Sequence, residues 1–414
     1  MNVAFLLHLY QPSTQQDSTF KAIVQECYLP LFKLLKAKSA CKFTLDMPLS
    51  LVEQLDKYGY TEILAQTKEL LDAEKIELTG SAAYHPLLTK ITAEFALRQI
   101  IFNEYGLGYY FGQRQGFEGE ASMMIKDLKG FFPPEMAVNT NVLNVVDTLK
   151  YDWMAVDTCA IDNKFVKNSH SCVYKVVNTD IKLVVRDADL SNMISFKRDD
   201  NIDDIIAYLA SLETNNIHDV VIALDGETFG HHNKYGIDIL DSLTDALTAI
   251  GARILTVSDI VEQADCLDIP SILESTWSCT SSDNIYPLWL TPSNTIQPVF
   301  WDLLHQVEAE FASKKMPGTS DGYENIAIWK QTDLNKISDT KQRDFLNLEL
   351  MVFKSMQSDQ FWWASNVTLY DKVLYSPTML AHALDIYKKI ADFELMKSIK
   401  ENILHLSADI ERQI

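Results

Sequence analysis

Basic side chains are scarce in this sequence. Its 414 residues include 36 lysines and arginines against 57 aspartates and glutamates, which leaves a net charge of −21. A surface this acidic repels the phosphates of nucleic acids and the headgroups of anionic membranes. We therefore expect neither nucleic acid nor membrane as a partner. A neutral glycan meets no such repulsion.

Cysteines are also few, and no two of them form a C-x-x-C pair. In so long a chain this predicts buried free thiols in a reducing compartment and argues against a disulfide framework. The first residues, Met1–Leu7, lack a basic start and predict a strand, not a signal peptide. No apolar run reaches the length of a membrane span. We therefore expect a cytoplasmic protein. The cysteines are Cys27, Cys41, Cys159, Cys172, Cys266 and Cys279.

Several catalytic signatures are missing from the chain. A G-x-S-x-G turn, which exposes the nucleophile of many serine hydrolases, does not occur. Nor does the phosphate-binding G-x-x-x-x-G-K loop or the zinc-binding H-x-x-x-H spacing. These absences argue against serine-hydrolase, phosphate-binding and H-x-x-x-H zinc chemistry.

Short apolar or β-branched runs alternate with helical patterns over the first 265 residues, for example at Ile202, Ile205, Ile206 and Leu209. Such alternation predicts an α/β fold with a parallel sheet, and seven or eight strands favour a closed or nearly closed barrel. An open doubly wound sheet is the alternative. The expected strands are Val3–His8, Phe43–Asp46, Ile76–Thr79, Phe131–Glu135, Trp153–Val156, Lys182–Arg186, Val220–Asp225 and Arg253–Val257.

The pattern changes after residue 265. Residues 266–295 are rich in Ser, Thr, Pro and Trp and predict an ordered loop region. Three long helical patterns follow, at about 296–314, 336–358 and 376–413, and the polar stretch Lys314–Gly322 predicts a surface loop. We therefore expect two domains, a catalytic barrel over 1–265 and a helical bundle over 266–414.

The first candidate for chemistry is Glu135, which ends the stretch Gly130–Glu135. Pro133 and Pro134 fix the backbone and cannot donate ladder hydrogen bonds, so the chain must leave the sheet there. A carboxylate at such a rigid exit, after two phenylalanines, is a candidate nucleophile. The alternative is an ordinary exposed glutamate in the first turn of a helix.

The second candidate is Asp225, which follows the five apolar residues Val220–Leu224. Such a strand is buried on both faces and delivers its last residue to the edge of the sheet. The neighbouring His231 and His232 leave two other interpretations open. The Asp-Gly pair could be a simple turn, or Asp225 with these histidines, and with His8, could hold a metal ion.

These segments, in their order along the chain, resemble the five motifs of glycoside hydrolase family 57. Tyr10 stands where the first motif, H-x-H-Q-P, has its second histidine. Phe132 stands where the third motif, G-x-W-x-P-E, has tryptophan. Both replacements predict altered sugar contacts. Arg186–Ser191 also resembles a loop of the family. The matching segments are His8–Pro12, Glu77–Pro86, Gly130–Glu135, Asp225–Gly230 and Leu348–Trp363.

The resemblance implies an incomplete (β/α)7 TIM-like barrel followed by a C-terminal helical bundle. It further implies a retaining hydrolase or transglycosylase of α-glucans that needs no metal or cofactor, with Glu135 as nucleophile and Asp225 as general acid/base. Linkage, acceptor and oligomeric state stay open. The rivals are a metal-dependent deacetylase or α-mannosidase-like enzyme on a related barrel, and a non-catalytic carbohydrate-binding protein. Expected substrate contacts are His8, Gln11, His85, Arg186, Asp187, His231, Trp277 and Trp362.

Overall fold

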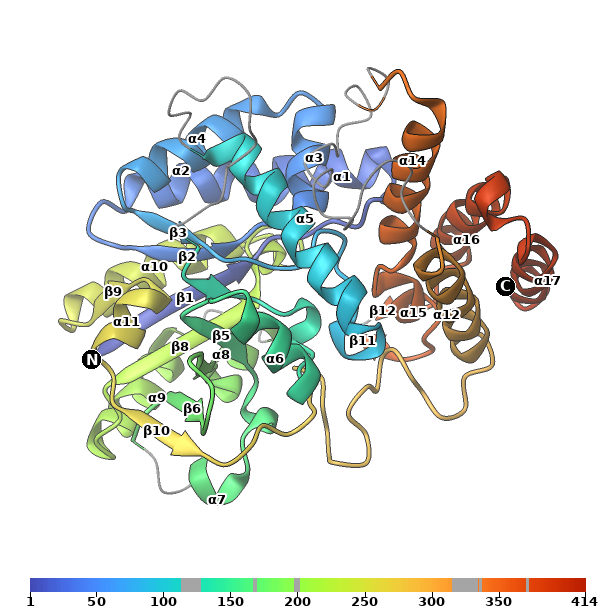
Figure 1. The fold of residues 1–414 in the computed structure, drawn as a ribbon. Helices are drawn as coiled ribbons and strands as arrows, with labels where there is room; N and C mark the ends of the chain where they lie inside the picture. Colours follow the sequence, from blue (N-terminus) through green and yellow to red (C-terminus); the bar gives the residue numbers. More distant parts are fainter. Residues whose placement is uncertain (113–127, 167–169, 197–201, 315–333, 335–336, 370–371) are drawn as a thin grey trace.

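A computed structural model describes residues 1–112, 128–166, 170–196, 202–314, 334, 337–369 and 372–414 (Figure 1). The predicted surface loop Lys314–Gly322 lies outside these residues except for Lys314. The strands are β1 Asn2–His8, β2 Phe43–Asp46, β3 Ile76–Leu78, β4 Gly130–Phe131, β5 Trp153–Val156, β6 Val173–Val176, β7 Lys182–Val185, β8 Asp219–Asp225, β9 Arg253–Leu255, β10 Cys266–Ile269, β11 Thr368–Leu369 and β12 Lys372–Val373.

Helices lie between most of these strands and make up most of the chain beyond residue 296. The α-helices are α1 Asp17–Ile23, α2 Leu29–Ala37, α3 Leu49–Lys57, α4 Thr61–Asp72, α5 Ala93–Phe111, α6 Thr140–Thr148, α7 Asn163–Val166, α8 Ala188–Phe196, α9 Ile202–Thr214, α10 Gly236–Ala249, α11 Val257–Gln263, α12 Gln297–Ala312, α14 Thr340–Ser355, α15 Asp359–Trp363, α16 Pro377–Ala391 and α17 Lys400–Glu411. Short π and 3-10 turns are η1 Val24–Tyr28, η2 Leu88–Lys90, η3 Pro134–Met136, η4 Thr158–Ala160, η5 Gly226–Thr228 and η6 Glu394–Met396.

Seven parallel strands follow one another around a central core. One sheet runs β3-β2-β1-β8, and the other contains β7-β5-β4. A bridge between Gly80 and Phe131 joins β3 to β4, and the backbone amide of Asp187 donates to the carbonyl of Val221, which joins the end of β7 to β8. This arrangement is consistent with the expected barrel and not with an open sheet.

Side chains on the central strands alternate between two apolar layers. On β1, Phe5 packs outward against the helices α1 to α4, whereas Leu6 packs into the interior of the strand ring. On β8, Ile222 packs outward and Ala223 inward. Because strand side chains alternate with a period of two, the last residue of each strand, His8 and Asp225, continues the inward row.

Four short strands were missed by the sequence patterns: β6, β10 and the two-residue strands β11 and β12. β6 pairs antiparallel with β7 and β10 pairs with β6, so both extend the second sheet beyond the parallel strands. β6 reaches β7 without an intervening helix, which breaks the strand–helix alternation on which the prediction relied. Three of the four β10 residues are exposed and Asp268 interrupts its apolar residues, so β10 lacks the unbroken apolar run of a buried strand. The expected strand to Glu135 was also too long, because β4 ends at Phe131.

The predicted helix over 376–413 was wrong as a single element. α16 ends at Ala391, the backbone becomes extended at Phe393, and α17 begins only at Lys400. No glycine or proline marks this break in the sequence, so tertiary packing decides it: Met396, between the two helices, is fully buried.

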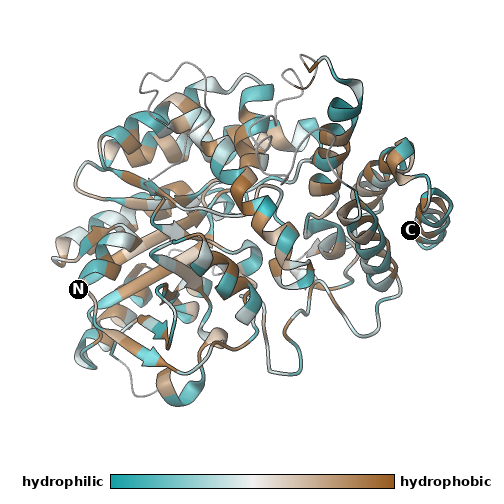
Figure 2. Ribbon diagram, viewed as in Figure 1, coloured by the Kyte–Doolittle hydropathy of each residue, from teal (hydrophilic) through white to brown (hydrophobic). Residues whose placement is uncertain are grey.

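The helices after residue 296 pack on one another and on helices α3 and α5, which belong to the first 265 residues. α16 contacts α14, α15 and α17, and α12 contacts α14 and α17. Their apolar core continues across residue 265, because Leu49 of α3 and Phe102 of α5 belong to it. In Figure 1 these helices stand beside the strands, and Figure 2 shows hydrophobic colour concentrated on the central strands.

The cysteine prediction is right for two residues and wrong for others. Cys27 and Cys41 are buried, whereas Cys159 and Cys266 are exposed, and all six are free thiols. Within the part of the chain that the structure covers, no helix combines the length and the apolar character needed to cross a lipid bilayer.

Candidate active site

Three acid–base side chains meet where β1, β2 and β8 end. In the strand register, His8 pairs with Asp46 on one side and with Asp225 on the other. Asp46 and His8 are buried, and Asp225 is partly exposed. The carboxyl ends of parallel strands share one edge, which is where barrel enzymes place their catalytic groups.

Glu135 reaches this edge from the exit of β4. Pro133 and Pro134 end the sheet, and the chain then turns through η3 with φ 60° and ψ 16° at Glu135 and φ 46° at Met136. Left-handed backbone at a non-glycine residue costs of order 1–3 kcal/mol and persists only where surrounding contacts enforce it. The alternative of an exposed glutamate in an ordinary helix is therefore wrong, since the Glu135 side chain is only 14% exposed.

Two donors from distant segments hold the Glu135 carboxyl group. The indole Nε1–H of Trp277 donates to Oε2 at 2.9 Å, and the hydroxyl of Ser358 donates to Oε1 at 3.0 Å. The Trp277 amide also donates to the Glu135 carbonyl. Burial, followed by the negative charges of Asp359 and Asp225, raises the pKa of Glu135 to about 8.

Asp225 belongs to the same group of interacting ionisable side chains. Its charge is one of the causes that raise the pKa of Glu135, so the two carboxyl groups lie within electrostatic reach of each other. Among the residues that the structure describes, none forms a hydrogen bond or ion pair with the Asp225 carboxylate. The charge of Asp225 is also one of the causes that raise the pKa of His8.

His8 and His85 are in contact with each other, and His8 also contacts Asp46. His8 Nδ1 contacts Asp46 Oδ2 at 2.7 Å, and His8 Nε2 contacts His85 Nε2 at 3.1 Å. Burial lowers the pKa of His8, but the hydrogen bond and charge of Asp46 outweigh it and raise the value to about 9. Burial and the positive His8 hold the pKa of His85 well below its usual range. One imidazole is therefore charged and the other neutral.

Two further carboxyl groups border the pocket. Asp359, at the start of α15, accepts a hydrogen bond from the Tyr10 hydroxyl at 2.5 Å. Glu227 accepts from the Tyr28 hydroxyl and from the Tyr10 amide. Burial is the main cause that raises the pKa of Asp359 to about 6 and of Glu227 to about 7. Tyr10 also stacks on His85, with 3.9 Å between ring centroids.

Arg186 connects β8 to the segment that contains Trp277. Its guanidinium is buried and donates to Asp157 at 2.7 Å, to the carbonyl of Ala223 at 3.1 Å and to the carbonyl of Trp277 at 3.2 Å. It also lies 5.6 Å from the Trp277 ring centroid. These contacts fix the segment that presents Trp277 to Glu135.

Four other predicted contact residues make no hydrogen bond or ion pair with Glu135 or Asp225 in the described parts of the chain. Gln11 is buried and donates to Glu227 at 3.3 Å. Asp187 caps α8, accepting from the Leu190 amide at 2.8 Å. His231 contacts Glu26 at 2.7 Å. Trp362 packs partly buried against the core of the C-terminal helices. Their contact with a sugar stays a prediction.

Comparison with known proteins places this chain in a family. The sequence profile described as glycosyl hydrolase family 57 matches residues 6–271, more than half of the chain. The chain belongs to this family. No curated protein matches the chain in sequence.

Solved structures of family 57 enzymes are similar in fold. A branching enzyme from Pyrococcus horikoshii has a TM-score of 0.72 at 15% identity, covering 99% of this chain and 94% of its own. The amylase AmyC from Thermotoga maritima has a TM-score of 0.61 at 14% identity, covering 100% and 98%. A 4-α-glucanotransferase from Thermococcus litoralis has a TM-score of 0.64 at 18% identity, covering 94% and 59%.

Several pocket residues of this family 57 chain escaped the sequence prediction. Asp46 had an available signal, because it closes its strand as His8 closes β1. Asp359 and Ser358 had none beyond the motif resemblance, since they lie at the start of α15 and reach the barrel only through tertiary packing. Tyr10 was noted only as a replacement, and its bond to Asp359 depends on that packing.

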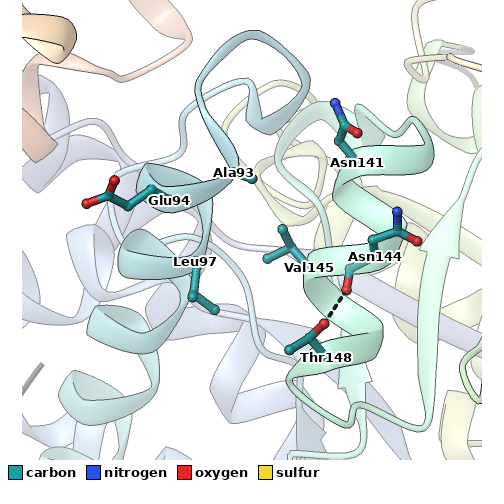
Figure 3. Close-up of a pocket in the computed structure, with 7 residues that line it drawn as sticks. All are labelled: Ala93, Glu94, Leu97, Asn141, Asn144, Val145 and Thr148. Atoms are coloured by element: carbon teal, nitrogen blue, oxygen red, sulfur yellow. Dashed lines mark hydrogen bonds between the residues drawn. The ribbon is translucent and has the colours of Figure 1, made fainter. Parts of the chain in front are cut away.

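Two surface grooves lie away from this family 57 site. One, of about 400 Å³, lies between α5 and α6, where Glu94 and Leu97 face Asn141, Asn144, Val145 and Thr148 (Figure 3). The other, of about 340 Å³, includes Lys129, Tyr151 and Lys182 near the amino ends of β4, β5 and β7. Neither Glu135 nor Asp225 lines either groove, so neither groove is the candidate active site.

Proposed function

We propose that the chain is a retaining glycoside hydrolase or transglycosylase of α-glucans, with Glu135 as nucleophile and Asp225 as general acid/base. The observation that carries this proposal is that both oxygens of Glu135 accept hydrogen bonds, while Asp225, whose charge raises the pKa of Glu135, forms no side-chain hydrogen bond among the described residues. A nucleophile must keep its orientation, whereas an acid/base must reach both leaving group and water.

The reaction would run in two displacements. Ionised Glu135 attacks the anomeric carbon while Asp225 gives its proton to the glycosidic oxygen, which leaves as a hydroxyl group and a glycosyl-enzyme remains. Asp225, now ionised, takes a proton from water or from an acceptor sugar, whose oxygen attacks the same carbon and releases Glu135. Retention in this way expects carboxyl groups about 5–5.5 Å apart.

The charge of the pocket supports sugar chemistry. The transition state of glycoside cleavage resembles an oxocarbenium ion and carries positive charge. Asp359 and Glu227 flank Glu135 and Asp225, and each ionised carboxylate favours positive charge in a buried site. The aromatic rings of Tyr10 and Trp277 add surfaces on which a sugar ring can stack.

The metal-dependent rival needs Asp225, His231, His232 and His8 around one ion. In the structure, His231 uses Nδ1 for Glu26, and both ring nitrogens of His8 contact other side chains, Asp46 and His85. These contacts favour carboxylate chemistry over the rival. A purified sample treated with a chelator should keep its activity, and loss of activity that a metal restores would favour the rival.

We further propose that residues 266–414 form a helical bundle that completes the cleft of the barrel formed by residues 1–265. Two contacts support this division of labour. Ser358 donates to Glu135 at 3.0 Å, and Asp359 accepts from Tyr10 at 2.5 Å, so two adjacent residues at the start of α15 contact barrel residues of the candidate site.

Incubation with maltooligosaccharides, followed by separation of the products, tests the activity. Shorter sugars indicate hydrolysis, and longer ones indicate transfer. Azide rescue tests the roles. With an activated α-maltoside, a Glu135→Gly variant should give the β-glycosyl azide, because azide replaces the nucleophile on its own face.

An Asp225→Gly variant should instead give the α-glycosyl azide, because Glu135 still forms the glycosyl-enzyme and azide attacks second. The opposite pairing of azides with variants would reverse the two assignments. An exposed aspartate provides the control: Asp392→Asn, which changes a surface ion pair with Lys400, should behave as the parent.

A further inference from the structure

A continuous chain of hydrogen bonds runs from Asp46 to Glu135. Asp46 contacts His8 at 2.7 Å, His8 contacts His85 at 3.1 Å, His85 Nδ1 contacts the Ser358 oxygen at 3.0 Å, and Ser358 contacts Glu135 at 3.0 Å. All of these side chains except Glu135 are 3% exposed or less. Because buried polar groups need hydrogen-bond partners, each contact in this chain must join one donor to one acceptor.

The order follows from the charge on His8. Its Nδ1 faces the carboxylate of Asp46, and the negative Asp225 and Glu227 also raise its pKa, so His8 carries a proton on each nitrogen. Its Nε2–H then donates to His85, whose pKa is held low and whose Nε2 accepts.

The remaining protons are fixed by this first step. A neutral His85 that accepts at Nε2 carries its proton on Nδ1, so it donates to the Ser358 oxygen. The Ser358 hydroxyl is then free to donate only onward, to Oε1 of Glu135. Every link uses one donor and one acceptor.

We infer that Asp46, His8, His85 and Ser358 are positioning residues that form a one-way relay and hold a donor on Oε1 of Glu135. The effect on catalysis rests on the proposed role of Glu135, but the relay itself does not. Trp277 donates to the other oxygen, Oε2, so both oxygens of the carboxyl group are held by hydrogen bonds.

The relay also sets the charge of Glu135. The positive His8 and the Ser358 hydrogen bond are the two causes that lower the pKa of Glu135, against burial and the charges of Asp359 and Asp225, which raise it. If His8 loses its positive charge, the pKa of Glu135 should therefore rise, and Glu135 should stay protonated to a higher pH.

Nitrogen-15 NMR of histidine side chains tests the relay without reference to activity. At pH 7.5, we expect both nitrogens of His8 to be protonated and His85 to be the neutral Nδ1–H tautomer. In an Asp46→Asn variant, His8 should become neutral. A neutral His8 in the unaltered protein, or an Nε2–H tautomer of His85, would overturn the inference.

Kinetics of Ser358→Ala provide a second test that does not disturb the buried Asp46. We expect kcat to fall roughly 10- to 100-fold, in line with loss of a hydrogen bond to a charged group, and the acid limb of kcat/KM to move to higher pH. Ser313→Ala, at an exposed helix end, is the matched control and should change neither. An unchanged acid limb in Ser358→Ala contradicts the relay.

The two kinds of failure can be told apart. If the unaltered protein cleaves no α-glucan, the proposed function fails, while the NMR result still decides the relay. If the protein is active and His8 is neutral, the relay fails and the function stands.

Discussion

At the scale of single residues, Glu135 combines a carboxyl group with a left-handed backbone that glycine adopts at little cost. Its φ of 60° is enforced by the two prolines before it and by the contacts of Trp277 and Ser358. Strain of this kind is stored where function requires one orientation. The side chain is also buried at a cost, since burial is the main cause that raises its pKa.

We therefore expect Glu135→Ala to abolish turnover while the Tm stays nearly unchanged. The variant loses two hydrogen bonds but also loses a buried ionisable group, and these effects oppose each other. The free energy of unfolding of Glu135→Gly should exceed that of Glu135→Ala by about 1 kcal/mol, because glycine tolerates positive φ. Its Tm should be higher accordingly. Thermal unfolding and product assays measure both. Persistent activity in Glu135→Ala would refute its role as nucleophile.

Asp359 allows a second prediction at this scale. Its negative charge is the first-named electrostatic cause, after burial, that raises the pKa of Glu135 to about 8. Because the nucleophile acts ionised, kcat/KM should rise with pH to about 8 in the unaltered protein. Asp359→Asn removes the charge and should move this limb to lower pH. A pH–rate profile checks the direction, and a shift to higher pH would contradict the assignment.

At the scale of elements, the join between β3 and β4 depends on two glycines in close contact with aromatic rings. A Cβ at Gly130 would lie 2.0 Å from Trp153, and one at Gly80 would lie 2.0 Å from the Tyr151 hydroxyl. These glycines connect the two sheets and so place the exit of β4, with Glu135, beside β3.

Gly130→Ala should therefore destabilise the protein by about 3 kcal/mol or more, since Trp153 is fully buried and cannot move aside. Gly59→Ala is the control. Its Cβ would meet nothing within 4 Å, and only its φ of 80° is unfavourable, so about 1 kcal/mol is expected. Denaturant unfolding measures both. Equal losses in the two variants would show that close packing at Gly130 is not important.

The elements also show where sequence patterns work. Strands that alternate with helices, such as β5 and β8, were predicted almost to the residue, because burial on both faces leaves an unbroken apolar run. β6 was missed because no helix separates it from β7, and β10 was missed because Asp268 interrupts its short apolar stretch and three of its four residues are exposed. The break between α16 and α17 has no local signal.

At the scale of the whole molecule, buried carboxyl groups give stability an unusual pH dependence. Glu135, Glu227 and Asp359 have pKa values of about 8, 7 and 6, all above the values of an unfolded chain. A group whose pKa is raised on folding stabilises below its unfolded pKa, and this stability is lost as pH rises through the folded value. His8, at about 9, acts in the same direction.

We therefore expect the Tm to fall by several degrees between pH 5.5 and pH 9. Glu135→Gln and Glu227→Gln should each reduce this slope, because an amide does not ionise. Asp392→Asn, on the surface, should leave it unchanged. Scanning calorimetry across this pH range measures the effect, and a Tm that rises with pH would contradict the buried-carboxyl explanation.

The sequence by itself determined the alternation of strands and helices, the rigid exit before Glu135 and the delivery of Asp225 to a strand end, because these depend on local periodicity, proline geometry and burial. Only the tertiary structure decided which groups touch them. The donors Trp277 and Ser358 lie more than a hundred residues from Glu135, and Asp359 reaches Tyr10 from the far end of the chain. Such contacts depend on how separate elements pack, which local sequence does not encode.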